Sequence, residues 1–319
     1  MGVYSRLTNR SMIKRQERKS KTLGTLIKQK YLFMMLFPSL LYYFIFRYIP
    51  MYGVIIAFKD YNFISGIWGS KWVGLKYFKQ FLQNPYFFRT LRNTFIISIN
   101  SLFWFFPVPI IFAILLNEVK NTQFKKTIQT VTYLPHFISI VTVVGLLKQL
   151  TSPTTGVINA VIMTLGGNPI NFFMEKGWFV PLYVISAIWS DFGWGAIVYI
   201  AAISGIGQEL YEAASIDGAG RFRQIWHITI PGIMPTVVIL LILRMGSLLD
   251  VGYEKILLMY NEGIYETSDV ISTYIYRNGI RQANYSFGTA VGLLNSTVSL
   301  ALVIMSNYIS KNVTEVGLW

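Results

Sequence analysis

The chain has 319 residues, of which 53% are hydrophobic and 13% are charged, about half the charged fraction of an average soluble domain. Its mean hydropathy of +0.47 excludes a disordered chain, a coiled coil and an ordinary cytosolic enzyme. The net charge of +14 would suit a nucleic-acid-binding protein, but basic residues also orient membrane helices. We therefore expect a lipid bilayer, and no nucleic acid, as partner. With no cysteine and two histidines, the chain is not expected to hold a metal site.

Six stretches are long and apolar enough to cross a hydrocarbon core, which takes about 20 helical residues. They cover residues 31–58, 87–116, 127–150, 178–205, 231–251 and 287–310. Pro107 and Pro109 predict a kink in the second stretch. The sequence thus predicts an all-α membrane protein with six transmembrane helices and one transmembrane domain over residues 31–319.

The N-terminal segment predicts the orientation of these helices. Residues 1–30 hold nine Lys or Arg and one acid, Glu17, so this segment is expected in the cytoplasm. The apolar run behind it is too long for a cleaved signal peptide. Six spans then place both termini in the cytoplasm, with inner loops at 117–126 and 206–230. The outer loop 59–86 also carries lysines, so the basic bias rests on the N-terminal segment.

Known catalytic patterns are absent from the sequence. It contains no phosphate-binding P-loop, no zinc-protease motif and no serine-hydrolase motif. Polar residues within the apolar stretches are scattered and suggest no catalytic triad. We predict no catalytic residue and no cofactor bound by this chain, so active transport would draw its energy from another subunit or from an ion gradient.

The segment 209–235 is unusual for a connection between two apolar stretches. Residues 209–215 are typical of a helix with an acid near its start, where the helix dipole favours negative charge. Asp217 and Gly218 predict a break with positive φ at the glycine. A second amphipathic stretch follows, and Pro231 fits the first turn of the next span. Two short helices would then lie along the inner face, either docking another protein or anchoring the loop at the interface.

This segment resembles the "EAA" loop of type I ABC importer permeases, in which Glu-Ala-Ala, three residues, Gly, nine residues, Ile, one residue and Leu-Pro follow each other. The matching residues are Glu212, Ala213, Ala214, Gly218, Ile228 and Pro231, with Ile230 in place of Leu. Segments that resemble the polysaccharide- and aldouronate-type branch are 48–53, 72–75, 92–94, 133–139, 189–194 and 317–319. The resemblance covers nearly all of residues 30–319.

The resemblance implies the type I ABC importer permease fold, a bacterial cytoplasmic membrane and an oligosaccharide cargo. It implies a second homologous permease subunit, two cytoplasmic ATPase subunits that bind ATP and Mg²⁺, and an extracytoplasmic solute-binding protein. Glu212 would pair with a basic residue of the ATPase, and Gly218 would turn the loop so that it docks. Asp217 joins the other matching residues in the predicted coupling loop. An ion-coupled secondary transporter that works alone, and a membrane scaffold without transport, are the alternatives.

Polar and tryptophan side chains within the spans are predicted to line the substrate path, because buried polar groups are costly in a bilayer and are mostly functional. They are Asn100, Trp104, His136, Trp189, Asp191, Trp194, Arg244 and Asn295. The tryptophans would stack on sugar rings or face lipid. His136 would line the path or bond a carbonyl freed at Pro135. Arg244 would face a carboxylate of an acidic cargo, pair with Asp191 or extend toward the headgroups.

Overall fold

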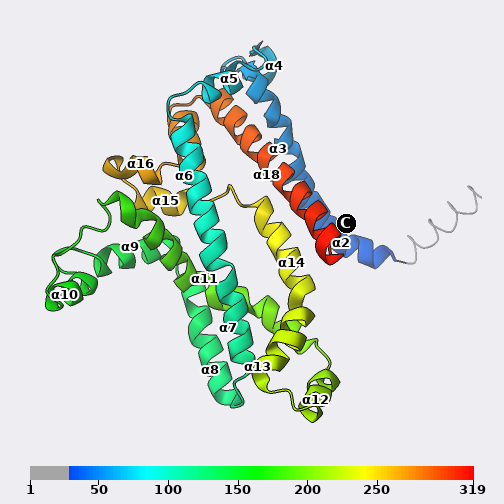
Figure 1. Ribbon diagram of the computed structural model, residues 1–319. Helices are drawn as coiled ribbons and strands as arrows, with labels where there is room; N and C mark the ends of the chain where they lie inside the picture. The colour runs from blue at the N-terminus through cyan, green and yellow to red at the C-terminus, as the bar shows by residue number, and fades with distance from the viewer. Residues whose placement is uncertain (1–28) are drawn as a thin grey trace, which may run out of the picture. The chain divides into compact units, whose positions relative to one another are not determined.

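The computed structural model describes residues 29–319, and most of the predicted basic segment 1–30 therefore lies outside the described residues. The chain divides into two units, residues 1–56 and 57–319, which are described separately. Helices make up nearly all the regular structure of the described residues (Figure 1). A short antiparallel pair joins β1 (Lys59–Asp60) to β2 (Lys71–Trp72).

The described part of the first unit is one long apolar helical segment. It comprises α2 (Lys30–Tyr43), the π-helical turn η1 (Phe44–Tyr48) and α3 (Ile49–Met51), and it continues as the 3-10 helix η2 (Tyr52–Phe58). The span that these elements form, Lys30–Phe58, is long enough to cross a bilayer. Large apolar side chains are exposed along α2, which suits a helix surrounded by lipid.

The second unit contains the remaining spans and their connections (Figure 1). Its helices are α4 (Gly66–Gly69), α5 (Lys76–Leu82), α6 (Phe87–Asn100), η3 (Ser101–Phe105), α7 (Pro107–Asn117), α8 (Thr122–Tyr133), η4 (Leu134–Phe137), α9 (Ile140–Leu150), α10 (Val157–Thr164), η5 (Lys176–Trp178), α11 (Phe179–Ser204), α12 (Gln208–Ile216), α13 (Arg221–Gln224), η6 (Ile225–Thr229), α14 (Ile230–Gly246), α15 (Tyr253–Met259), η7 (Glu262–Ile264), α16 (Tyr265–Ser268), α17 (Ile271–Ile275), η8 (Tyr276–Arg281) and α18 (Tyr285–Thr314). Four continuous spans result: Phe87–Asn117, Lys176–Ser204, Arg221–Gly246 and Tyr285–Thr314.

The predicted span over 127–150 is present as a bent pair of helices and not as one continuous helix. α8 continues through η4 to Phe137, and this helix is bent by 99° against α9 at residues 138–139, so the two form a broken span or a re-entrant loop. Pro135 has no N–H to continue the helical ladder. The side chain of Ser139 then caps α9 by accepting from the N–H of Thr142 at 3.3 Å. Among the described residues there are five continuous spans, and six if this pair counts as one.

The fifth predicted span, 231–251, corresponds to α14, which begins at Ile230 with Pro231 in its first turn but ends earlier, at Gly246, and has no break before it. The helical segment already begins at Arg221 and passes through the π-helical turn η6 into α14. The wider turn lets the helix continue past Pro231, which lacks the donor for an ordinary helical bond. The π-helical turn η3 likewise ends just before Pro107, the first residue of α7. The structure therefore has a π-helical turn next to the prolines at which the sequence predicts a kink.

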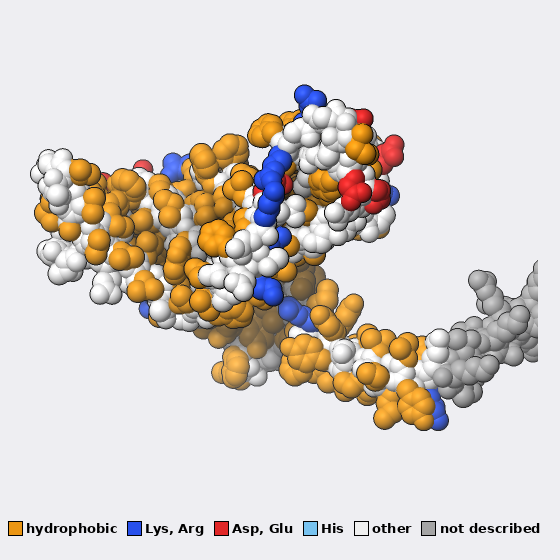
Figure 2. Space-filling view, turned by 90° about the horizontal axis from the view of Figure 1, so that it is seen from below, with side chains coloured by type: hydrophobic (Ala, Val, Ile, Leu, Met, Phe, Trp, Pro, Cys, Tyr) orange, Lys and Arg blue, Asp and Glu red, His pale blue; other side chains and the backbone are white. Residues whose placement is uncertain are grey.

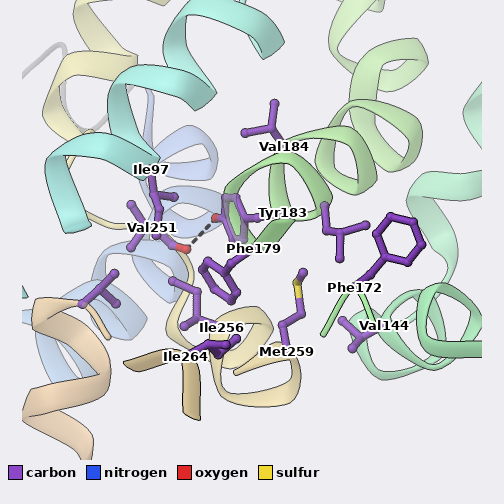
Figure 3. Close-up of a cluster of buried hydrophobic side chains, with 12 residues drawn as sticks. Ile97, Val144, Phe172, Phe179, Tyr183, Val184, Val251, Ile256, Met259 and Ile264 are labelled. Carbon is purple, nitrogen blue, oxygen red and sulfur yellow. Dashed lines mark hydrogen bonds between the residues drawn. The ribbon is translucent and has the colours of Figure 1, made fainter. Parts of the chain in front are cut away.

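A cluster of buried side chains fixes α15 against α11. Figure 3 shows Phe179 and Tyr183 of α11 beside Ile256 and Met259 of α15, all with little or no exposed surface. The hydroxyl of Tyr183 donates to the carbonyl of Val251 at 2.6 Å. This close packing holds the segment after α14 in a defined place on the long helix α11.

Candidate functional site

The loop between α11 and α14 folds as a helical hairpin whose turn depends on Gly218. Its φ is +75°, so the predicted positive φ is confirmed. The N–H of Ala219 donates to the carbonyl of Ala214 at 2.8 Å, and the N–H of Gly218 donates to that of Ser215 at 3.1 Å. These two bonds form a left-handed helix cap of the Schellman type. A Cβ at Gly218 would meet nothing within 4 Å, so glycine is favoured here by its backbone freedom.

Side-chain hydrogen bonds join the two short helices of this hairpin, α12 and α13. The amide of Gln224 donates to the hydroxyl of Ser215 at 2.9 Å and to the carbonyl of Ala219 at 3.1 Å. The guanidinium of Arg221 lies 3.7 Å from the carboxylate of Glu118, which ties the hairpin to the neighbouring loop 117–126. These contacts join α12 to the segment that begins the next span and join that segment to the loop 117–126.

The coupling-loop residues differ in exposure. Glu212, Ala213, Asp217, Gly218 and Pro231 are exposed, whereas Ala214 and Ile228 are half-buried. The Glu-Ala-Ala residues 212–214 lie in α12, and Asp217 and Gly218 form the turn that ends this helix. Ile228 and Pro231 lie on the span that follows.

Large apolar side chains are exposed beside them. Ile216 is 87% and Phe222 is 82% exposed, and a groove of about 720 Å³ is lined by Phe222, Trp226 and His227. Figure 2, seen from below, shows acidic side chains gathered on one lobe at this end, beside a row of basic ones. Exposed apolar side chains with polar groups around them are typical of a surface that contacts another protein or the membrane.

Three of the predicted path residues meet at the bend between α8 and α9. Nδ1 of His136 lies 2.7 Å from Oδ1 of Asp191. The imidazole ring stacks on Trp194, with centroids 4.6 Å apart and planes within 4°. The hydroxyl of Ser190 donates to the other oxygen of Asp191 at 3.0 Å. His136 is thus paired with a carboxylate, rather than with a carbonyl freed at the bend.

Gly193 brings the helices close enough for this contact. A Cβ at this position of α11 would lie 2.3 Å from the carbonyl oxygen of Thr132 in α8. Real side chains never approach that closely, so α8 and α11 touch backbone to backbone only because residue 193 is glycine. The close approach places His136, four residues after Thr132, against Asp191.

The other predicted path residues do not join this group. The amide of Asn100 donates to the carbonyl of Ile96 at 2.8 Å, and Asn100 and Trp104 line a groove of about 500 Å³ with Ile185 and Ile188 of α11. Trp189 is 44% exposed.

Two further polar residues of the spans carry buried atoms without partners. Nε of Arg244 and Oδ1 of Asn295 have no hydrogen-bond partner among the described residues. Among the described residues Arg244 forms no ion pair with Asp191, whose carboxylate pairs with His136 instead. The Nε–H group of Arg244 thus remains without an acceptor within its span.

Sequence reasoning missed a buried ionic cluster around Asp269. This fully buried carboxylate accepts from Arg89 at 2.9 Å, Arg277 at 2.7 Å and the hydroxyl of Thr273 at 2.9 Å. Asn93 donates to the Asp269 carbonyl at 3.0 Å. Hydrogen bonding and charge from Asp269 outweigh burial and raise the pKa of the Arg277 guanidinium. Arg89 and Asp269 are 180 residues apart, and the only visible signal was the gathering of charges at the start of the second span.

Lys255 of α15 was also not predicted. Its ammonium donates to the carbonyl of Tyr183 at 2.9 Å and lies 4.5 Å from the centre of the Tyr183 ring. It has no carboxylate within ion-pair distance among the described residues. Burial lowers the pKa of this lysine to about 8, although the charge of Asp191 opposes the shift.

These features define an integral membrane protein with a helical hairpin between two of its spans. The chain belongs to the family of binding-protein-dependent transport system inner membrane components, whose model matches residues 102–315. It is a permease subunit of an ABC importer and carries no ATPase itself, and the predicted all-α fold of such permeases is confirmed, whereas the orientation of the termini stays a prediction.

Relatives cover almost the whole chain. It is 48% identical over 297 residues to Protein LplB of Bacillus subtilis (strain 168), with 93% of each chain covered. It is 44% identical over 309 residues to the polygalacturonan/rhamnogalacturonan transport system permease protein YteP of the same organism, with 97% of this chain and 96% of YteP covered. A chain in the crystal structure of a bacterial alginate ABC transporter, in complex with an alginate pentasaccharide-bound periplasmic protein, matches with a TM-score of 0.84 and 41% identity, over 92% of this chain and 99% of that one.

Proposed function

We propose that this permease carries an acidic, uronate-containing oligosaccharide across the bacterial cytoplasmic membrane. The observation that carries the proposal is the likeness, over more than nine-tenths of the chain, to a polygalacturonan/rhamnogalacturonan permease and to a transporter of the acidic polysaccharide alginate. Both named polymers contain sugar carboxylates.

The partners in this proposal are a second homologous permease, two ATPase subunits that hold ATP and Mg²⁺, and an extracytoplasmic solute-binding protein. The exposed acids and apolar side chains of the hairpin at residues 206–230 support a docked partner. Glu212 would pair with a basic group of an ATPase, and Ile216 would enter an apolar part of the same interface. Because the hairpin is internally clasped, closure of the ATPase pair would move it as one body.

The substrate path would use the half-exposed groups within the spans. The exposed rings of Trp104 and Trp194 offer flat apolar faces to the C–H surface of a sugar. Arg244 would face a cargo carboxylate, because a cation in a low-dielectric environment attracts an anion far more than it does in water. Its buried Nε atom, which has no partner among the described residues, supports this assignment.

The complete complex in proteoliposomes tests the cargo. We expect ATP-dependent uptake of acidic oligosaccharides in preference to neutral ones of equal length, and no uptake by this chain alone under an ion gradient. The Arg244→Gln variant should lose acidic-sugar uptake about tenfold and keep neutral-sugar uptake. Equal loss of both, with a reduced membrane yield, would make Arg244 a structural residue. A preference of the wild type for neutral sugars would contradict the proposed cargo.

Thiol labelling of intact cells tests the orientation. The natural chain has no cysteine, so single cysteines report without background. Cysteines at Lys126 and Gly220 should be shielded from an impermeant reagent, while one at Asn261 should react. Labelling of Gly220 from outside would reverse the proposed topology.

A further inference from the structure

A polar pocket of about 370 Å³ lies where the start of α6 meets α16 and η8. These elements are in the part of the second unit far from α12 (Figure 1). The pocket is therefore separate from the hairpin at residues 206–230. It is also lined by none of the predicted path residues.

The pocket carries an excess of positive charge. Arg89 and Arg277 both line it, and both donate to the same oxygen of the single carboxylate of Asp269. Two guanidinium groups against one buried carboxylate leave one positive charge. Glu266 does not cancel it by pairing here, since its carboxylate pairs with Lys176. Nε of Arg89 is buried and has no hydrogen-bond partner within residues 29–319.

Aromatic and amide groups complete the lining. The guanidinium of Arg89 lies 4.5 Å from the ring centre of Tyr86, and that of Arg277 lies 4.6 Å from the ring centre of Tyr265. The cations thus hold these rings in place. Asn84 and Asn278 also line the pocket. Flat rings suit the C–H face of a sugar, amides suit its hydroxyls, and a guanidinium suits a carboxylate.

The size of the pocket favours a sugar unit over a protein side chain. Small-molecule sites typically enclose about 300–1,000 Å³ and combine apolar walls with a few convergent polar groups. This pocket has both properties. An acidic side chain of a docking protein would need the cation alone and would leave the amides and much of the volume unused.

We propose that this pocket binds one uronate unit of the cargo, so that it is a recognition subsite for acidic sugars outside the membrane path. The nature of the cargo rests on the proposed function, whereas recognition of a carboxylate rests on the pocket itself. Arg89 is the specificity-determining residue. Its guanidinium carries five N–H donors, of which the bond to Asp269 uses one, while Arg277 and Thr273 also bond Asp269.

Equilibrium binding to the complete transporter in nanodiscs, without its solute-binding protein, tests this subsite. The probes are a galacturonate trisaccharide and its neutral methyl ester. We expect the wild type to prefer the acidic probe, and Arg89→Gln to weaken that probe about tenfold while leaving the ester unchanged. Arg92→Gln is the matched control, because Arg92 lies on the same helix, donates to the carbonyl of Glu266 and does not line the pocket.

Thermal unfolding of each variant shows whether it is folded, and Arg89→Lys, which retains the charge, provides a second variant if Arg89→Gln is unstable. We expect Arg89→Lys to bind the acidic probe with intermediate affinity. Equal affinity of the wild type for acid and ester, or of wild type and folded Arg89→Gln for the acid, would overturn the subsite. Weakened docking of the binding protein with unchanged sugar binding would assign the pocket to a protein carboxylate and also overturn it. Uptake by the wild type separately tests the proposed function, so the two failures are distinguishable.

Discussion

His136 and Asp191 are joined side chain to side chain at 2.7 Å, although 55 residues separate them in the chain. The contact links the bend after α8 to the middle of α11. It gives both polar groups a partner within the spans, where an unpaired charge is costly. The bend and the long helix are therefore held together at the place where Trp194 offers a half-exposed ring.

The first prediction concerns this pair. His136→Gln and Asp191→Leu should each lower the free energy of unfolding by about 1 kcal/mol, because each leaves the other group without its partner. The double variant should be little worse than either single one, since the interaction is lost only once. Thermal unfolding in detergent measures the cycle, and strictly additive losses would show that the two side chains act independently.

The second prediction concerns the close contact at Gly193. Gly193→Ala should destabilise the protein by about 1–3 kcal/mol, because the added methyl group meets the carbonyl of Thr132 and forces α8 from α11. Gly292→Ala is the matched control in another span. A Cβ there meets nothing within 4 Å, and alanine favours a helix more than glycine does. Equal unfolding temperatures for the two variants would contradict the backbone contact.

The third prediction concerns Lys255 and pH. Burial lowers its pKa from 10.5 to about 8, so the unfolded chain binds more protons than the folded protein between these values. Stability attributable to this group should therefore rise as the pH rises from 8 to 10.5, by about 3 kcal/mol at most.

Lys255→Met should remove this pH dependence. Because tyrosines also titrate near pH 10, the quantity to compare is the difference in unfolding temperature between wild type and Lys255→Met at each pH. We expect the variant to be the more stable at pH 7, with its advantage shrinking as the pH rises. A difference that stays constant from pH 7 to 10 would show that Lys255 has an ordinary pKa.

Local patterns predicted the hairpin at residues 206–230 well, because its signals lie within a few residues of one another. An acid near the helix start and Gly218 after it were sufficient to predict a short helix and a left-handed turn. The matching turn geometry follows from the backbone freedom of a single residue. Hydropathy likewise predicted the other spans, since each needs only length and composition.

The sequence could not predict the geometry at Pro135 or the partners of the buried charges. A proline either bends a helix or ends it, and here the cap at Ser139 and the contact of Gly193 with Thr132 accompany a break. The Arg89–Asp269 and His136–Asp191 pairs join segments far apart in the chain. No residue spacing in the sequence indicates which side chains will meet across such a distance. The sequence also did not indicate that the short helix from Arg221 joins α14 without a break, because Pro231 in the first turn of α14 is typical of the start of a separate helix.

Substrate-stimulated ATP hydrolysis by the reconstituted complex is the most direct test of coupling through the hairpin. Gly218→Val and Gly220→Val form a matched pair, because a Cβ meets nothing within 4 Å at either position. They differ in backbone conformation, since φ is +75° at Gly218 and −67° at Gly220. We predict that Gly218→Val inserts normally but loses the stimulation, since a β-branched residue disfavours the left-handed turn, whereas Gly220→Val keeps it. Full stimulation of ATP hydrolysis in the Gly218→Val complex would contradict the account.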